Sequence, residues 1–296
     1  MSILVGFKGG EPGSDALLLA AQLAAAARLP IHVMTVAVRP RNLMPGRATD
    51  AFGEYTRRRF AESEAEARSV LTALPSAGDL DVRFAHRISR STGLALIDGV
   101  SEVSASLVVL ASAPGRGGRI SVGPVANRLI HSSRVPVAVA PLGWSAVATA
   151  APPRRTELTA AFDGSTENEH VLGETLALAA TFGARVRVAT FGVRGVVMYP
   201  PEGGLDSEDE ALAEWIDQTE RAVAKLRRPG GLLADVPTVV STGDDWSDAL
   251  SALDWVPGDV LCVGTTPHGG LARVFIGTRG TRILTHSPVP VIALPA

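Results

Sequence analysis

The residues best suited to chemistry lie in a glycine-rich stretch near the end of the 296-residue chain, VGTTPHGGLARVFIGTRGT at 263–281. A predicted strand ends at Gly264, and a predicted helix begins at Gly277 and Thr278. A helix start that carries glycine and a hydroxyl presents free N–H groups and the positive end of the helix dipole, which suits phosphate. An ordinary turn followed by a helix capped by Thr278 has the same sequence requirements. The stretch is therefore either a phosphate loop or a capped turn.

A second candidate is the AFDGS motif at 161–165, which follows another apolar run. Ligands of open parallel sheets bind at the carboxyl ends of the strands, so a turn after the first strand of a domain lies in the right place. Asp163 is able to accept hydrogen bonds from a ligand or to cap the next helix, and the residues alone favour neither use. The end of the next strand, at Thr190 and Phe191, is expected beside this turn.

The elements that must position these motifs form an internal repeat. NRLIHSSRVPVAVAP at 127–141 matches TRILTHSPVPVIALP at 281–295. The openings at 3–36 and 158–191 also match, each as a strand, a glycine-containing turn, an Ala/Leu-rich helix and a second strand. A repeat of this length predicts two copies of one domain.

Each half is predicted to be a doubly wound α/β domain with a five-stranded, mainly parallel sheet flanked by helices. All-apolar runs such as SLVVLAS alternate with helical segments, which indicates strands buried on both faces. A charged helix is expected at about 52–74 and again at 207–228. We predict a first domain at 1–142, a linker of small residues and proline at 143–157, and a second domain at 158–296. The proline-flanked final strands are expected at sheet edges, packed together in a pseudo-twofold contact.

Composition excludes several classes of function. Charged residues make up 20% of the chain and the net charge is -2, so no basic field attracts nucleic acid. No apolar stretch is long enough to span a bilayer and the N-terminus lacks a signal-peptide pattern, so a cytoplasmic protein is expected. Of the 28 basic residues only Lys8 and Lys225 are lysines, a bias typical of GC-rich, actinobacterial-type coding. The single cysteine, Cys262, is expected to be a buried hydrophobe.

The sequence indicates no catalytic residue and assigns no metal ligand. Its histidines fall in no Ser-His-acid pattern and in no metal-ligand spacing. His268, beside Pro267, either touches a bound phosphate or is simply exposed. The long segment at 192–210 leaves the second strand's end, and its Tyr199 either covers a ligand or belongs to an idle loop.

The arginine run at 57–59 lies among Glu62, Glu64 and Glu66. Charges of opposite sign at this spacing favour a salt-bridged helix face over an anion site.

The spacing Gly264-x2-Pro267-x9-Gly277-Thr278 resembles the nucleotide-binding signature G-x2-G-x9-G-[S/T] of the universal stress protein family. The likeness covers both halves, so the chain is identified as a tandem member with the adenine nucleotide alpha hydrolase-like fold. The resemblance implies a stress-response module that binds ATP or another adenine nucleotide, with Mg²⁺ accompanying it. The contacts that the resemblance implies are made by Ala161, Phe162, Asp163, Phe191, Val263, Gly264, Pro267, Gly277 and Thr278.

Within that resemblance each group has a role. Asp163 is expected to hydrogen-bond adenine and ribose, and the strand end at Phe191 to face the base. Gly277 and Thr278 are expected to contact the phosphates. Two residues depart from the pattern. Pro267 replaces a glycine and supplies neither its N–H nor its close approach, and Gly280 stands where many members have a second hydroxyl.

The first half departs further. Lys8 stands where the second half has Asp163, and the loop ASAPGRGGRISVGP is one residue short and ends in Pro124 in place of the hydroxyl residue. We therefore expect no ATP binding of the family type in the first domain. Lys8, with Arg116 and Arg119 on the facing loop, is either an anion site or a solvated lysine in a decayed site.

Three functions remain at this point. The first is a non-enzymatic nucleotide-sensing module whose second domain is the binder. The second is a slow ATP hydrolase, although the sequence supplies neither a positioned base nor a Walker-type lysine. The third is an interaction scaffold that acts through its surface or as a homodimer.

Overall fold

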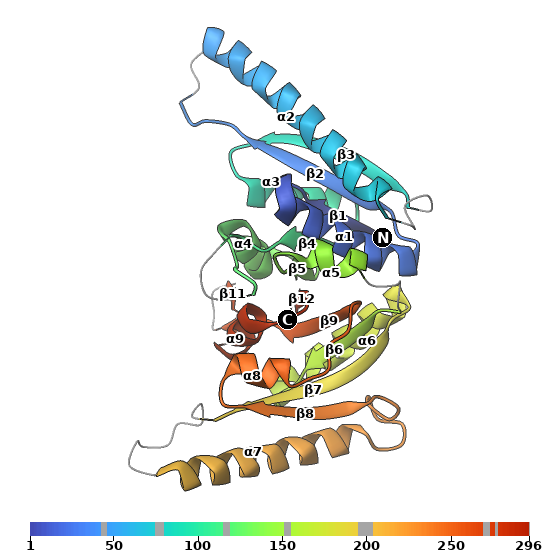
Figure 1. Ribbon diagram of the computed structural model, residues 1–296, viewed down its shortest axis with the longest axis vertical. Helices are drawn as coiled ribbons and strands as arrows, with labels where there is room; N and C mark the ends of the chain where they lie inside the picture. The colour runs from blue at the N-terminus through green and yellow to red at the C-terminus, as the bar shows by residue number, and fades with distance from the viewer. Residues whose placement is uncertain are drawn as a thin grey trace. The chain divides into compact units, whose positions relative to one another are not determined.

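The computed structural model of the chain describes residues 1–42, 46–74, 80–114, 119–150, 155–194, 204–268, 273–275 and 278–295. Its contacts divide the chain into two compact units, Met1–Pro153 and Arg154–Ala296, which we call the first and second domains. Each consists of a parallel sheet with helices packed on it (Figure 1). No helix in the described part of the chain is long and apolar enough to cross a membrane.

The first domain has five strands in the order β3-β2-β1-β4-β5, and its described strand pairs are parallel. The chain leaves the central strand β1 to build one side of the sheet and then crosses to the other side at β4. The elements are β1 (Ser2–Gly6), α1 (Gly10–Ala27), β2 (Ile31–Val38), α2 (Arg47–Thr72), β3 (Val82–Ser89), α3 (Thr92–Glu102), β4 (Ala105–Ala111), α4 (Pro124–Ser132), β5 (Val137–Ala140) and α5 (Trp144–Ala150).

The second domain repeats this arrangement, with the strand order β8-β7-β6-β9-β12. A short 3-10 turn at Thr166–Asn168 precedes its first helix, and a two-stranded antiparallel ribbon, β10 with β11, follows β9. The elements are β6 (Glu157–Ala161), α6 (Glu169–Phe182), β7 (Arg185–Val193), α7 (Gly204–Leu226), β8 (Thr238–Gly243), α8 (Trp246–Ser251), β9 (Asp259–Gly264), β10 (Thr266–His268), β11 (Arg273–Phe275), α9 (Thr278–His286) and β12 (Val291–Leu294).

Both sheets form where the apolar runs predicted them. Ile3, Leu4 and Val5 of β1 are fully buried, as expected for a strand covered on both faces. The predicted charged helices are α2 and α7, which differ from the expected bounds by a few residues at each end. The prediction of two repeated doubly wound α/β domains is confirmed.

Helix α5 lies in the segment that the sequence assigned to a linker. It packs against α1, and Trp144 at its start is 3% exposed. The Asp15 carboxylate, fully buried in α1, accepts hydrogen bonds from the N–H groups of Gly143 at 2.9 Å and Ser145 at 2.7 Å. A residue in one helix thus satisfies the free donors at the start of another.

Replacing Asp15 with alanine should lower the free energy of unfolding of the first domain by about 1–3 kcal/mol, because two partly buried N–H groups lose their acceptor. Urea unfolding of the full chain measures this change. Asp98→Ala, which removes an exposed carboxylate from α3, is the control and should change stability by no more than about 0.5 kcal/mol. Equal effects of the two variants would show that the Asp15 bonds contribute nothing.

Candidate functional site

A pocket of about 110 Å³ opens in the second domain at the carboxyl ends of β6 and β9, where the strand order reverses. This is the position at which ligands bind in open parallel sheets. It collects residues from the β6 turn, the end of β7, the start of α8, the end of β9 and the first turns of α9. The lining residues are Ala161, Phe162, Asp163, Ser165, Asn168, Phe191, Trp246, Val263, Gly264, Arg279, Gly280 and Ile283.

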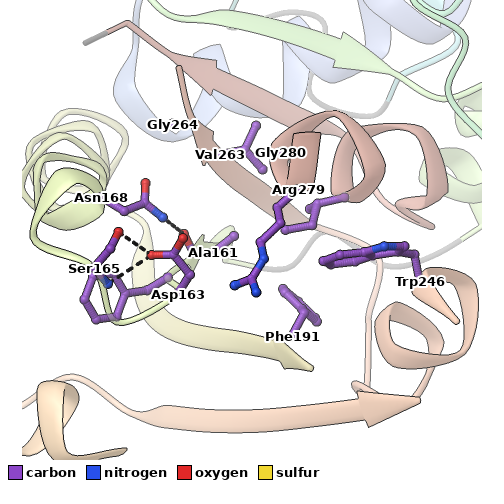
Figure 2. Close-up of a pocket in the computed structure, with 12 residues that line it drawn as sticks. Ala161, Asp163, Ser165, Asn168, Phe191, Trp246, Val263, Gly264, Arg279 and Gly280 are labelled. Atoms are coloured by element: carbon purple, nitrogen blue, oxygen red, sulfur yellow. Dashed lines mark hydrogen bonds between the residues drawn. The ribbon is translucent and has the colours of Figure 1, made fainter. Parts of the chain in front are cut away.

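Asp163 is held by the turn that follows β6. Its Oδ1 accepts hydrogen bonds from the Ser165 hydroxyl at 2.6 Å and the Ser165 N–H at 3.1 Å (Figure 2). Gly164 between them has φ +83, and a side chain there would press on Thr219 of α7. The residues at the N-cap positions of the two following helical segments are Ser165 and Asn168. Asp163 therefore fixes a local turn beside the pocket and does not occupy a helix cap.

The end of β9 approaches the start of α6 closely at Gly264. A Cβ added there would lie 2.3 Å from the Val171 side chain and 3.0 Å from the Asn168 Oδ1. The Asn168 amide also donates to the Ala161 carbonyl at 3.4 Å, which joins α6 to the end of β6. Glycine is required at 264 by packing between strand and helix, and its backbone still borders the pocket.

Phe191 and Trp246 form an apolar part of the pocket wall and are buried to 5% and 9% exposure. The Thr190 hydroxyl donates to the Phe162 carbonyl at 3.0 Å, so the ends of β7 and β6 are tied together. An aromatic wall beside a hydrogen-bonding carboxylate is suited to a flat heteroaromatic ring.

Arg279 is a pocket residue that the sequence predictions did not include. Its side chain extends from the first turn of α9 into the space between Asp163 and Phe191 (Figure 2). The guanidinium carbon lies 5.3 Å from the centre of the Trp215 ring on α7, within the range of a cation–π contact. Among the described residues that line the pocket, Asp163 and Arg279 are the charged ones.

The glycine-rich stretch after β9 is partly a hairpin, where an open loop was expected. Thr266 pairs with Phe275, and Pro267 pairs with Val274. A two-stranded ribbon has a free edge on each strand, so it tolerates a proline, which has no N–H to donate. Thr265 anchors the start of the stretch, since its N–H and hydroxyl both donate to the Leu294 carbonyl at 2.9 Å.

Several predicted residues lie outside what the structure describes. Gly277, Tyr199 and Arg116 are among the undescribed residues, and the side chains of Pro267, His268 and Thr278 are likewise not described. Of the nine predicted contacts, the pocket brings together Ala161, Phe162, Asp163, Phe191, Val263 and Gly264.

Five further lining residues were not singled out from the sequence: Ser165, Asn168, Trp246, Arg279 and Ile283. Two of them had a usable signal. Trp246 comes three residues after the run TVVSTG, which forms β8 and ends at Gly243. Arg279 follows Gly277-Thr278 in the first turn of a predicted helix, so both lie at the carboxyl edge of the sheet. Ile283 is indistinguishable in sequence from an ordinary core residue.

Metal binding and cysteine chemistry are two uses that the described residues bear on. No cluster of three or more His, Cys, Asp or Glu residues suited to a metal ion occurs among the described residues. Cys262 is fully buried, and desolvation raises the pKa of its thiol to about 12. The thiolate form is therefore inaccessible at neutral pH, as the sequence led us to expect of a packing residue.

The corresponding edge of the first domain is different. Lys8 follows β1 at the position of Asp163, and it lines a cleft together with Ala111, Pro114 and Pro124. Arg119 is described and exposed but does not line this cleft. Arg58 of the arginine run pairs with Glu62 as predicted, whereas Arg59 donates to the Lys8 carbonyl.

Comparison with known proteins agrees with this geometry. The model of the universal stress protein family matches the chain twice, at residues 1–141 and 156–295. The chain belongs to the universal stress protein family. Universal stress proteins of Mycobacterium tuberculosis (strain H37Rv) and Mycobacterium bovis are 39% identical to it over 298 residues, covering 100% of each chain. The resemblance drawn from the sequence is thereby confirmed.

Solved structures of the family share the fold of this universal stress protein. A universal stress protein from Archaeoglobus fulgidus superposes with a TM-score of 0.58 at 15% identity, covering 99% of this chain and 98% of that one. A putative universal stress protein from Pseudomonas aeruginosa gives a TM-score of 0.54 at 16% identity, covering 99% and 92%. At such identities the likeness concerns the fold alone.

Proposed function

We propose that the second domain binds an adenine nucleotide and that the protein is a regulatory, nucleotide-sensing module in which no bond is broken. The observation that carries the proposal is the pocket at the sheet's switch point, which joins Asp163, an aromatic wall and Arg279 at one edge. A carboxylate accepts hydrogen bonds from ribose or the adenine amino group, and an arginine fork suits phosphate.

The present free volume of about 110 Å³ is smaller than the roughly 300–1,000 Å³ of typical ligand pockets. Part of the space between Asp163 and Phe191 is taken by the Arg279 side chain (Figure 2). We propose that a nucleotide enters as Arg279 swings away from Trp215 toward the phosphates. If Mg²⁺ accompanies the nucleotide, the phosphates would hold it, as they usually do together with one or two carboxylates.

Titration calorimetry of the full chain with ATP, ADP, AMP and adenosine, with and without Mg²⁺, tests the proposal. Asp163→Ala should lower the affinities for ATP and for adenosine by about tenfold each, because it removes a hydrogen-bond acceptor for the adenosine part that both ligands contain. Asp217→Ala, which removes an exposed carboxylate on α7, is the control and should leave both affinities unchanged.

Three outcomes oppose the proposal. Absence of binding by the unmutated chain with all four ligands would contradict nucleotide binding and favour the scaffold. Unchanged affinity in Asp163→Ala would place the nucleotide elsewhere. Steady ADP release from ATP that follows nucleotide occupancy would replace the sensing role with hydrolysis.

A further inference from the structure

The first domain has a cleft that is larger than the candidate nucleotide pocket of the second domain. It encloses about 540 Å³ at the carboxyl ends of β1, β2 and β4, beside the first turns of α1 and α4. That volume lies within the range of small-molecule sites. The described residues that line the cleft all belong to the first domain.

The walls of the cleft are largely apolar. Phe7, Met34 and Leu110 line it, and each of these side chains is at most 5% exposed. Val38, at the end of β2, is 53% exposed and also lines the cleft, so the apolar surface continues to the opening. An apolar ligand that covers the part of this surface still open to solvent, Val38 above all, is favoured.

Among the described residues that line the cleft, the charged ones are Lys8 and Arg59, and both are cations. Arg59 reaches in from α2 and donates to the Lys8 carbonyl, so part of its donor capacity is used. Glu66 of α2 accepts from the Gly10 N–H behind this loop and is not among the lining residues. No ion pair of the exposed Lys8 ammonium occurs among the described residues, while the Glu66 Oε2 lies beside the neighbouring Gly9, 2.7 Å from where a Cβ would stand.

The cleft of the first domain lacks the features that would suit a nucleotide. Lys8 replaces the acceptor for ribose and base, and Pro124 opens α4 without an N–H. The loop between β4 and α4 closes on itself, since the Ser121 N–H donates to the Ser112 hydroxyl at 2.8 Å and the Ala113 N–H to the Ser121 carbonyl at 2.8 Å. These backbone donors are therefore unavailable to a polyphosphate.

We propose that this cleft binds an alkyl monocarboxylate, with the hydrocarbon against Phe7, Met34 and Leu110 and the carboxylate at the Lys8 ammonium. The carboxylate matches the positive charge of Lys8, and the hydrocarbon matches the largely apolar walls of the cleft. The chain thus carries two sites of different chemistry, a carboxylate site in the first domain and the nucleotide site proposed for the second.

Calorimetry of the full chain with decanoate, octanoate and 1-decanol, kept below their aggregation concentrations, tests this proposal. Decanoate should bind about tenfold more tightly than octanoate, because it buries two more methylenes. Decanoate should also bind about tenfold more tightly than 1-decanol, because only the carboxylate forms a charge-assisted bond with Lys8.

Lys8→Met keeps the length of the side chain and removes its charge. It should lower the affinity for decanoate about tenfold and leave the affinity for 1-decanol unchanged. The chain offers a matched control in Lys225→Met, which removes its only other lysine, on α7 of the second domain. That variant should bind decanoate as the unmutated protein does.

A second measurement locates the ligand without relying on a variant. Reductive ¹³C-methylation labels Lys8, Lys225 and the N-terminus, and the mutant spectra assign the two lysine signals. Decanoate should shift the Lys8 signal and leave the Lys225 signal in place. Equal binding of decanoate and 1-decanol, or an unmoved Lys8 signal at saturation, would overturn the proposal. Neither result bears on nucleotide binding by the second domain.

Discussion

Replacing Arg187 with methionine will lower the free energy of unfolding of the second domain by about 3–5 kcal/mol at neutral pH, because it leaves a buried carboxylate without its cation. Arg187 lies on β7 with a side chain 15% exposed, and it pairs at 3.2 Å with Asp259, whose side chain is 3% exposed. The guanidinium also donates to the Thr159 hydroxyl at 2.8 Å and lies 4.9 Å from the centre of the Trp255 ring. Methionine fills similar space and removes all of these polar contacts.

The loss of stability caused by Arg187→Met will depend on pH, because Asp259 is ionisable. Burial raises the pKa of the Asp259 carboxyl above its usual value of 3.8, while the Val256 N–H and Arg187 act in the opposite direction. A raised pKa in the folded state means that the group stabilises the fold most below its unfolded-state pKa, and that this contribution is lost as pH rises through the folded-state pKa. Without Arg187 the pKa rises further. The defect of Arg187→Met should therefore shrink as the pH is lowered toward 4.

Urea unfolding at pH 4 and pH 7, followed by tryptophan fluorescence, measures both effects. Arg185→Met is the control, since Arg185 pairs with Glu157 while its own side chain is 57% exposed, and it should cost less than about 1 kcal/mol. Adding Asp259→Asn to Arg187→Met should recover part of the loss at pH 7. If Arg187→Met and Arg185→Met were equally stable, the buried pair would have no special role.

Replacing Arg279 with alanine will reduce the preference for ATP over adenosine by about 10- to 100-fold, the expected contribution of a charge-assisted contact to phosphate. The variant leaves Asp163 as the charged residue among the described pocket lining, and its negative charge disfavours an anion. Adenosine carries no phosphate and gains the space that the guanidinium occupied, so its affinity should stay constant or rise. The ratio of the two affinities isolates the phosphate contact from changes in pocket size.

Arg282→Ala provides the matched control, because Arg282 is exposed on the same helix and does not line the pocket. Arg279→Lys should retain a smaller part of the ATP preference, since an ammonium offers a point charge without the planar fork. An unchanged ratio in Arg279→Ala would mean that this side chain only fills the empty pocket. For Asp163→Ala we expect a different result. That variant should lower the affinities for ATP and adenosine equally and leave their ratio unchanged.

The fold could be predicted because its signals are local and repeated. All-apolar runs mark buried strands, and the match between 127–141 and 281–295 shows that the same order occurs twice. Helix α5 was not predicted, because the buried Asp15 that accepts from its first N–H groups lies 128 and 130 residues away in sequence. Small residues alone are compatible with either a linker or a helix.

The candidate site could be predicted where it consists of strand ends, and less well where it depends on side-chain direction. Asp163 and Phe191 follow apolar runs, so their place at the sheet edge was predictable. Whether Arg279 points into solvent or into the pocket depends on Trp215, on a helix some 60 residues earlier in the chain. The cation that Arg59 adds to the first-domain cleft likewise depends on how α2 packs, which the local charge pattern does not report.

The strand order also has a consequence for synthesis on the ribosome. β1 is the central strand of its sheet, yet its neighbour β4 begins at Ala105, about a hundred residues after β1. One edge of the first-made strand therefore stays open until most of the domain has been translated, and the same holds for β6 and β9. Long-range parallel pairing of this kind slows folding and exposes an apolar edge to other chains. Each nascent domain should thus depend on chaperones most strongly just before its fourth strand emerges.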